Sequence, residues 1–236
     1  WVGKKYLKTK DKALVLGLSH YSDTDFTKPT DFTTDIINLY LNYKNGNESH
    51  ERWMNTFTRF TNILNNRQVE VQEVENFWNS VVFYNYVQRA IYDGPRHSPS
   101  EEDFEKSHKA FIEIIEKYKP DTIIVWADEL WNHIPKEYIS LDEKSKVYQF
   151  KKGAVNADML TIYHPSSTKF SYDYWQNIEN KPNSLQDEQI KKLFPDAQID
   201  FPLNKEEEIN KTNTSEKPTT KPVYKGELTA KKEVRI

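Results

Sequence analysis

Four short apolar runs within the first 163 residues determine the expected fold. Each run is four or five residues long, is largely apolar, and is bounded by polar or turn-forming residues. Runs of this length without polar alternation are typical of strands that are buried on both faces of a parallel sheet. The pattern therefore predicts strands at residues 13–17, 81–84, 122–126 and 159–163.

Helical periodicity appears between these runs. Within 51–66, large apolar side chains recur at spacings of four, three and four, which places them on one helix face. These side chains are Trp53, Phe57, Phe60 and Leu64. Residues 101–118 predict a second helix, because Ser100 can cap it and Asp103 follows three residues later. Strands that alternate with helices predict an α/β fold, a three-layer α/β/α sandwich around a central, mainly parallel four-stranded sheet.

The composition changes towards the end of the chain, which suggests where the domain ends. We expect one folded domain over residues 1–180 and a polar extension over 181–236. From about residue 204 the extension is dominated by Lys, Glu, Thr and Asn, which bury too little apolar surface to offset the entropy of ordering. It is predicted to be largely disordered, and the alternative is an extended arm that docks through Val223 and Tyr224.

Charge and cysteine content narrow the possible functions. The chain has 33 basic and 36 acidic residues, a net charge of -3, so a DNA-binding function would depend on a local basic patch. It has no cysteine, which excludes disulfides, thiolate metal sites and a cysteine nucleophile. The six histidines show no close metal-ligand spacing, so no metal or other cofactor is expected. No apolar run is long enough to span a membrane, and a cytoplasmic protein is the default expectation.

Polar side chains gather where three of the four predicted strands end. In parallel α/β sheets, ligands bind beyond the carboxyl ends of the strands, so polar residues there are the best functional candidates. The segments concerned are 17–23, 85–88 and 164–170.

The segments contain Gly17-Leu18-Ser19-His20-Tyr21-Ser22, Asn85 and His164-Pro165-Ser166-Ser167. Taken together, over about residues 12–175, they resemble the motifs of the uracil-DNA glycosylase superfamily. The first reads Gly17-Leu18-Ser19-His20-Tyr21-Ser22, where the best-known branch has Gly-Gln-Asp-Pro-Tyr-His. The second strand ends in Asn85, where the family has the Asn that recognises the flipped base. The fourth strand leads into His164-Pro165-Ser166-Ser167, similar to the family's His-Pro-Ser motif.

The resemblance implies a DNA glycosylase-like hydrolase that flips out uracil or another modified base and cleaves its N-glycosidic bond. It implies that His164 stabilises the negative charge of the departing base and that Asn85 recognises the base edge. Tyr21 would exclude a base that carries a 5-methyl group. Gly17, Leu18 and Ser166 would complete the substrate site.

The sequence departs from the family pattern at two positions. Ser19 replaces the water-positioning Asp, so Ser19 itself, His20 and Asp23 are the loop residues able to take over that catalytic role. Thr168 stands where the family has its DNA-wedging Leu, and Phe170 is the nearest apolar candidate for a wedge. Contacts to DNA phosphates are expected from Ser167, Arg89 and Arg96.

Other interpretations remain open at this point. The loss of the family Asp at Ser19 favours a catalytically altered relative that binds nucleic acid or a nucleotide without cleaving it. A role in phage or mobile-element defence is a third interpretation. Asn85 and His164 also fit ordinary turn-stabilising roles, and Phe57 and Phe60 fit either base stacking or core packing. Ser19 beside His20 suggests a serine hydrolase, but no Gly-x-Ser-x-Gly elbow surrounds Ser19.

Overall fold

The computed structural model describes residues 1–21, 31–91, 98–143 and 147–176. Two expected site residues, Asp23 and Arg96, lie outside these ranges, as does the polar extension over 181–236. Of Tyr21, the structure describes the backbone alone.

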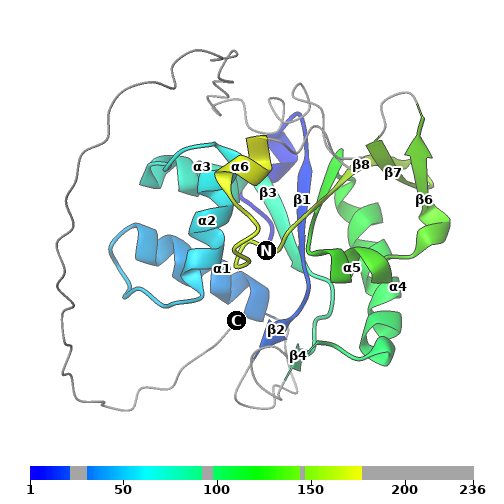
Figure 1. The fold of residues 1–236 in the computed structure, drawn as a ribbon, viewed down its shortest axis with the longest axis horizontal. Coiled ribbons are helices and arrows are strands. Elements are labelled where there is room, and N and C mark those ends of the chain that lie inside the picture. Colours follow the sequence, from blue (N-terminus) through cyan, green and yellow to red (C-terminus); the bar gives the residue numbers. More distant parts are fainter. Residues whose placement is uncertain (22–30, 92–97, 144–146, 177–236) are drawn as a thin grey trace, which may run out of the picture. The chain divides into compact units, whose positions relative to one another are not determined.

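The centre of the described fold is a mixed six-stranded sheet (Figure 1). Its strands, in spatial order, are β3 (Val81–Asn85), β1 (Ala13–Gly17), β5 (Thr122–Trp126), β8 (Val155–Ile162), β7 (Val147–Lys152) and β6 (Ile139–Asp142). The first four are parallel and include the four predicted strands, and β7 and β6 add an antiparallel edge. The sheet is therefore wider than the predicted four strands. Because β1, β3, β5 and β8 run in the same direction, their carboxyl ends share one edge of the sheet.

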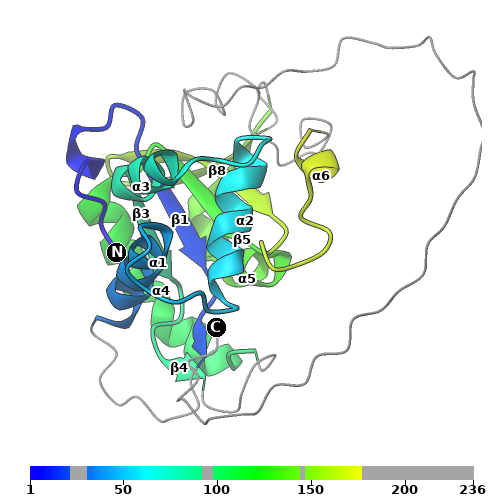
Figure 2. The same cartoon turned by 90° about the vertical axis from the view of Figure 1, so that its left-hand side faces the viewer.

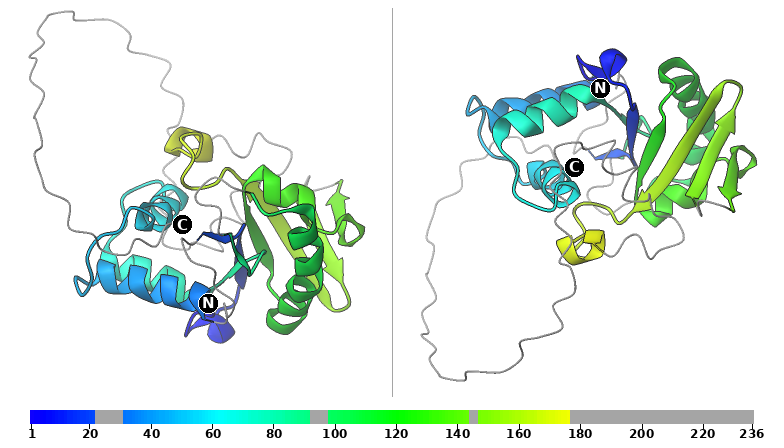
Figure 3. Two further views of the ribbon diagram at one scale, coloured as in Figure 1. Left: turned by 90° about the horizontal axis from the view of Figure 1, so that it is seen from below. Right: turned by 90° about the horizontal axis from the view of Figure 1, so that it is seen from above.

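Helices cover both faces of this sheet (Figures 2 and 3). On one face lie α1 (Phe32–Lys44), α2 (Met54–Leu64) and α3 (Val71–Ser80), and on the other lie α4 (Glu101–Tyr118) and α5 (Asp128–His133). The fold is thus α/β. The remaining short elements are η1 (Tyr6–Lys8), β2 (His20–Tyr21), β4 (Ala90–Ile91), η2 (Lys136–Tyr138) and α6 (Tyr172–Gln176). No helix in the described ranges combines the length and apolar character needed to cross a lipid bilayer.

The two strongest helix signals in the sequence correspond to α2 and α4. Ser100 caps α4 as predicted: the Asp103 backbone N–H donates to the Ser100 hydroxyl at 3.3 Å, and the Ser100 N–H donates to the Asp103 carboxylate at 3.0 Å. Helix α4 ends at Lys119, which adopts a left-handed conformation with φ of 47°. The cap at Ser100 and the left-handed residue Lys119 therefore mark the two ends of this helix.

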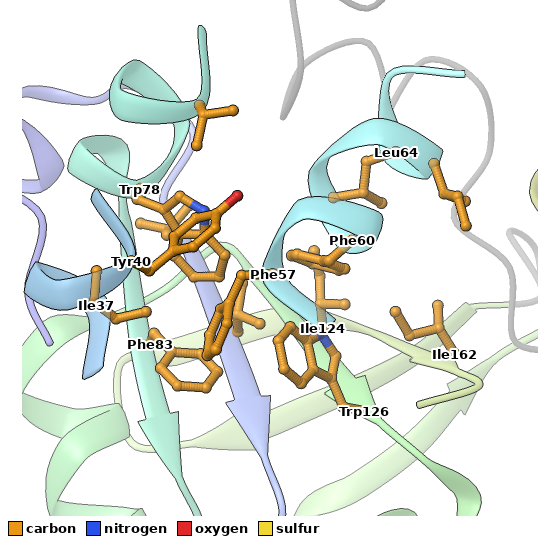
Figure 4. Close-up of a cluster of buried hydrophobic side chains, with 14 of the residues drawn as sticks. Ile37, Tyr40, Phe57, Phe60, Leu64, Trp78, Phe83, Ile124, Trp126 and Ile162 are labelled. Atoms are coloured by element: carbon orange, nitrogen blue, oxygen red, sulfur yellow. The ribbon is translucent and has the colours of Figure 1, made fainter. Parts of the chain in front are cut away.

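Alternate residues of the parallel strands pack against opposite helix layers. The layer under α1, α2 and α3 is a cluster of aromatic rings with Phe57 near its centre (Figure 4). The Phe57 ring packs against those of Phe83 and Trp126 at centroid distances of 5.6 and 5.9 Å, and these two rings contact each other at 5.3 Å. Phe57 and Phe60 are thus core residues, and the few apolar residues of the chain are concentrated in large rings that bury much surface each.

Candidate functional site

The three predicted strand ends meet in one cavity of about 300 Å³ at the carboxyl edge of the sheet. Gly17, Asn85 and His164, which are 68 and 79 residues apart in sequence, all line it. Among the residues that the structure describes, its lining consists of Gly17, Leu18, Ser19, His20, Ile36, Thr56, Phe57, Phe83, Asn85, Trp126, Ala127, Glu129, His164 and Ser166. The walls are mainly aromatic and aliphatic, and a small number of polar groups converge between them, as is typical of small-molecule sites.

Gly17 gives the Asn85 side chain the space it occupies. The two residues are direct partners in the parallel pairing of β1 with β3. A Cβ atom at position 17 would lie 2.1 Å from Asn85 Oδ1, far inside van der Waals contact. Two backbone hydrogen bonds also hold this end of β1 against the segment after β3. Gly17 O accepts from the Tyr86 N–H at 2.8 Å, and Leu18 O accepts from the Val87 N–H at 2.9 Å. A side chain at position 17 therefore requires the Asn85 carboxamide to move.

Replacing Gly17 with alanine is expected to destabilise the fold by about 1–3 kcal/mol, as overpacking of a dense interior typically does. The new methyl group and the Asn85 carboxamide cannot occupy the same space, so the carboxamide has to leave its bonding position. Denaturant unfolding of the parent and of Gly17→Ala measures the effect.

The matched control is the double variant Gly17→Ala/Asn85→Ala, in which the obstructing carboxamide is absent. Its loss of stability should be smaller than the sum of the two single losses, because the two residues are in direct contact. Additive losses would show that the methyl group is accommodated in another way.

His20 lies behind Asn85 in a buried row of hydrogen bonds. The Asn85 amide nitrogen lies 3.0 Å from His20 Nδ1 and 3.2 Å from His20 Nε2, and His20 Nε2 also lies 2.8 Å from the Thr33 hydroxyl in α1. The Phe32 ring packs edge-on against the imidazole at 4.5 Å. The His20 side chain is only 2% exposed, and this burial lowers its pKa to about 3, so the ring is neutral at physiological pH.

His164 follows β8 and faces the cavity as a neutral ring with one defined tautomer. Its Nδ1 accepts a hydrogen bond from the Ser166 backbone N–H at 3.2 Å and lies 2.7 Å from the Ser166 hydroxyl. The proton of the neutral ring is therefore on Nε2. Burial lowers the pKa of His164 to about 4, and the Trp126 ring packs edge-to-face against it at 5.7 Å. His164 thus offers a neutral N–H donor to a ligand.

These neutral histidines should make the protein less stable in mild acid. In the unfolded chain a histidine takes up a proton below about pH 6.5, whereas folded His20 stays neutral down to about pH 3. As the pH falls below 6.5, His20 alone lowers the free energy of unfolding by about 1.4 kcal/mol per pH unit. Urea titrations between pH 7.5 and 5 measure this slope, and His20→Phe should flatten it. An equal slope in both proteins would show that folded His20 titrates normally.

Ser19 contributes a buried hydroxyl to the cavity. Its Oγ has no hydrogen-bond partner among the residues that the structure describes, although it is shielded from solvent. A buried polar atom without a partner costs about 1–3 kcal/mol, so a ligand or a water molecule that bonded to it would be favoured. Tyr21, two residues further on, pairs through its backbone in β2 with Ile91 of β4.

The structure describes three of the residues expected to contact DNA, Ser167, Phe170 and Arg89, and places them in different surroundings. Phe170 is fully buried and stacks on Phe60 at 6.4 Å, so it is a core residue and the prediction of an apolar wedge is wrong for it. Ser167 stabilises the turn after His164, since its N–H donates to His164 O at 2.8 Å. Arg89 donates two hydrogen bonds of 2.8 Å to the Asp103 carboxylate and lines a different cavity beside α4.

Ala127 and Glu129 are among the lining residues that the sequence did not predict. They follow β5, whose carboxyl end lies at the same edge, so applying the strand-end rule to all four parallel strands would have found them. Glu129 is the one carboxylate among the described lining residues, and no Lys or Arg is among them. The described part of the cavity is therefore neutral to acidic rather than basic.

The site combines a neutral imidazole donor, a carboxamide, a free hydroxyl and a carboxylate between aromatic walls. Such a set can bind a flat, polar heterocycle and can stabilise negative charge that develops on one of its oxygens. The sequence matches no protein-family model and no curated protein at a significant level, so its chemistry is inferred from this geometry.

Proposed function

We propose that the protein is a DNA glycosylase-like hydrolase, with a uracil-DNA-glycosylase-type fold, that excises uracil or another modified base. The observation that carries the proposal is the meeting of Gly17, Asn85 and His164 in one cavity of about 300 Å³. Three segments that resemble one family's motifs, in the family's order, thus line a space suited to a single base. The proposal includes DNA as the partner and the cytoplasm as the setting.

In the proposed reaction, His164 stabilises the leaving group. The bond between C1′ of the sugar and the base nitrogen breaks, and its electron pair leaves with the base. Negative charge then develops on a carbonyl oxygen of the base, to which the Nε2–H of His164 donates. Because this ring is neutral and its Nδ1 is already bonded to Ser166, the donor is oriented before the substrate arrives.

The attacking water needs both a position and a proton acceptor. Its oxygen forms the new bond to C1′, and its proton passes to a carboxylate. The buried Ser19 hydroxyl lies where the family has its Asp and is free to bond this water. Glu129, from the end of β5, is the carboxylate that the described lining provides. Aromatic rings from Phe83 and Trp126 form the apolar wall beside the base.

A second candidate function is binding of a free base or nucleotide without cleavage. Two observations favour it: Ser19 carries no charge at the position of the family Asp, and the described lining holds no Lys or Arg to contact phosphates. A DNA glycosylase with this site would need its phosphate contacts from residues beyond the lining.

A base-release assay separates the two functions. Single- and double-stranded oligonucleotides that contain uracil or other modified bases are incubated with the protein, and abasic sites are then cleaved with alkali. Strand cleavage that depends on the protein and on the modified base supports the glycosylase. Titration calorimetry with uracil and other free bases tests binding separately. Binding without release supports the second candidate. If the protein neither releases nor binds any of the bases, both proposals are contradicted.

A further inference from the structure

The segment between β8 and α6, residues 163–171, carries His164 and is here called the His164 turn. It belongs to no helix or strand. Two backbone hydrogen bonds fold it: the Ser167 N–H donates to His164 O at 2.8 Å, and the Phe170 N–H donates to Ser167 O at 3.1 Å. Ordering each residue of such a segment costs backbone entropy, so two local bonds alone do not hold it in one conformation. Contacts with the rest of the fold have to supply the difference.

Helix α2 holds the far end of the His164 turn, and Figure 2 shows the helix beside the segment that leads to α6. Arg59 of α2 is half-buried, and its Nη2 donates to Phe170 O and lies 3.5 Å from Thr168 O. A guanidinium N–H that donates to a carbonyl forms a charge-assisted, directional hydrogen bond. The next helix residue, Phe60, stacks on the buried Phe170 ring at 6.4 Å. Two adjacent residues of α2 therefore grip the turn through its backbone and through its core side chain.

Helix α2 also reaches His164 by a second route, through aromatic rings. Phe60 contacts Trp126 at 4.9 Å, and Trp126 packs against the His164 ring at 5.7 Å (Figure 4 shows the first pair). Phe57 of the same helix lines the cavity. A change at Arg59 would remove the backbone route and leave the rings in place. Arg59 is thus the residue at which the hold on the turn can be tested without disturbing the core.

The orientation of the His164 ring depends on amides that belong to the turn. The Ser166 N–H donates to His164 Nδ1 at 3.2 Å, and the next amide, that of Ser167, donates to His164 O. If the far end of the turn were released, both amides would move relative to the ring. The Nε2–H would then no longer point in one direction. A displacement of about 1 Å in a catalytic group can slow a reaction by about 10²-fold, so a small movement here is sufficient.

We propose that Arg59 is a positioning residue that holds the His164 turn in one conformation and so keeps the His164 donor directed into the cavity before a substrate binds. The effect on base release rests on the proposed function. The hold on the turn does not depend on it, and the two are measured separately.

Amide hydrogen exchange of the ligand-free protein measures the hold. Arg59→Met keeps a long side chain that favours helix and removes the donor. The Ser167 and Phe170 amides should exchange at least about tenfold faster in this variant, as expected for the loss of one charge-assisted hydrogen bond. Amides in β5 report global unfolding and should keep their parent rates. Arg52→Met is the matched control, because Arg52 lies exposed just before α2 and its side chain has no hydrogen bond to the part of the chain that the structure describes.

A double-mutant cycle tests whether Arg59 acts through His164. Arg59→Met should slow single-turnover base release at saturating protein by about tenfold. In a His164→Ala background the same change should have no further effect, because the group that it positions is absent. Affinity for an uncleaved oligonucleotide should stay at the parent value in Arg59→Met, and Arg52→Met should keep the parent release rate.

Unchanged exchange of the turn amides in Arg59→Met would overturn the inference. So would an equal loss of rate in both His164 backgrounds together with weaker, salt-dependent binding of DNA, which is the result expected for a direct phosphate contact. If the parent releases no base, but the turn amides exchange faster in Arg59→Met, the glycosylase proposal and the catalytic part of this inference are overturned, whereas the hold on the turn is supported.

Discussion

Replacing His164 with alanine is expected to slow base release by about 10²- to 10³-fold, because the departing base then loses a fixed donor to its developing negative charge. The structure gives the physical reason: Nδ1 is held by Ser166, so the neutral ring presents Nε2–H to the cavity. Single-turnover measurements of base release from a uracil-containing oligonucleotide give the rate of the chemical step directly.

Two further variants separate this role from a general loss of structure. His50→Ala removes an exposed histidine that bonds only to Asn55 among the described residues, and it should keep the parent rate. Ser166→Ala removes the hydroxyl but keeps the backbone N–H that donates to His164 Nδ1, so its rate loss should be smaller than that of His164→Ala. Equal rates for the parent and a folded His164→Ala variant would exclude His164 from the mechanism.

The second large effect is on stability. Replacing Phe57 with alanine is expected to lower the free energy of unfolding by about 3–5 kcal/mol, the usual cost of removing a large aromatic ring from a core. Phe57 is 2% exposed, and its ring contacts those of Tyr40, Trp53 and Trp78 at 5.4, 5.8 and 5.3 Å. Urea unfolding at neutral pH measures the change.

Leu39→Ala serves as the control for this experiment, because Leu39 lies on α1 with 39% of its surface exposed. Its expected cost is below about 1 kcal/mol. A similarly small loss for Phe57→Ala would mean that the aromatic cluster closes over the space. Because Phe57 also lines the cavity, a stable variant with weaker base binding would show that the same ring shapes the site.

The sequence predicted the strands well because β1, β3 and β5 are buried on both faces and are therefore apolar along their whole length. It missed β6 and β7, since these strands mix buried and exposed residues and contain polar side chains such as Gln149 and Lys151, so neither is a continuous apolar run. Helix α1 was missed for a similar reason: its residues 32–35 belong to a polar stretch, and its packing against the sheet comes from tertiary contacts.

For the candidate site too, the sequence predicted the residues at strand ends but not the contacts that depend on the tertiary fold. Strand ends identified Gly17, Asn85 and His164, because parallel strands bring their carboxyl ends together whatever the sequence between them. No local pattern connects Thr33 with His20 and Asn85, so the hydrogen bonds between these side chains could not be predicted. Phe170 was misassigned because an apolar residue in a turn looks the same in sequence whether it points outwards or into the core.

The pairing of Gly17 with Asn85 across β1 and β3 has a consequence for how this chain can change in length. The two residues meet only because the register of the strands places them on the same rung. A one-residue insertion within β1 would move another residue onto that rung and would turn every later side chain of the strand to the opposite face. Length changes inside β1 or β3 should therefore remove the site even where the protein still folds, whereas insertions after Val87 leave this rung intact.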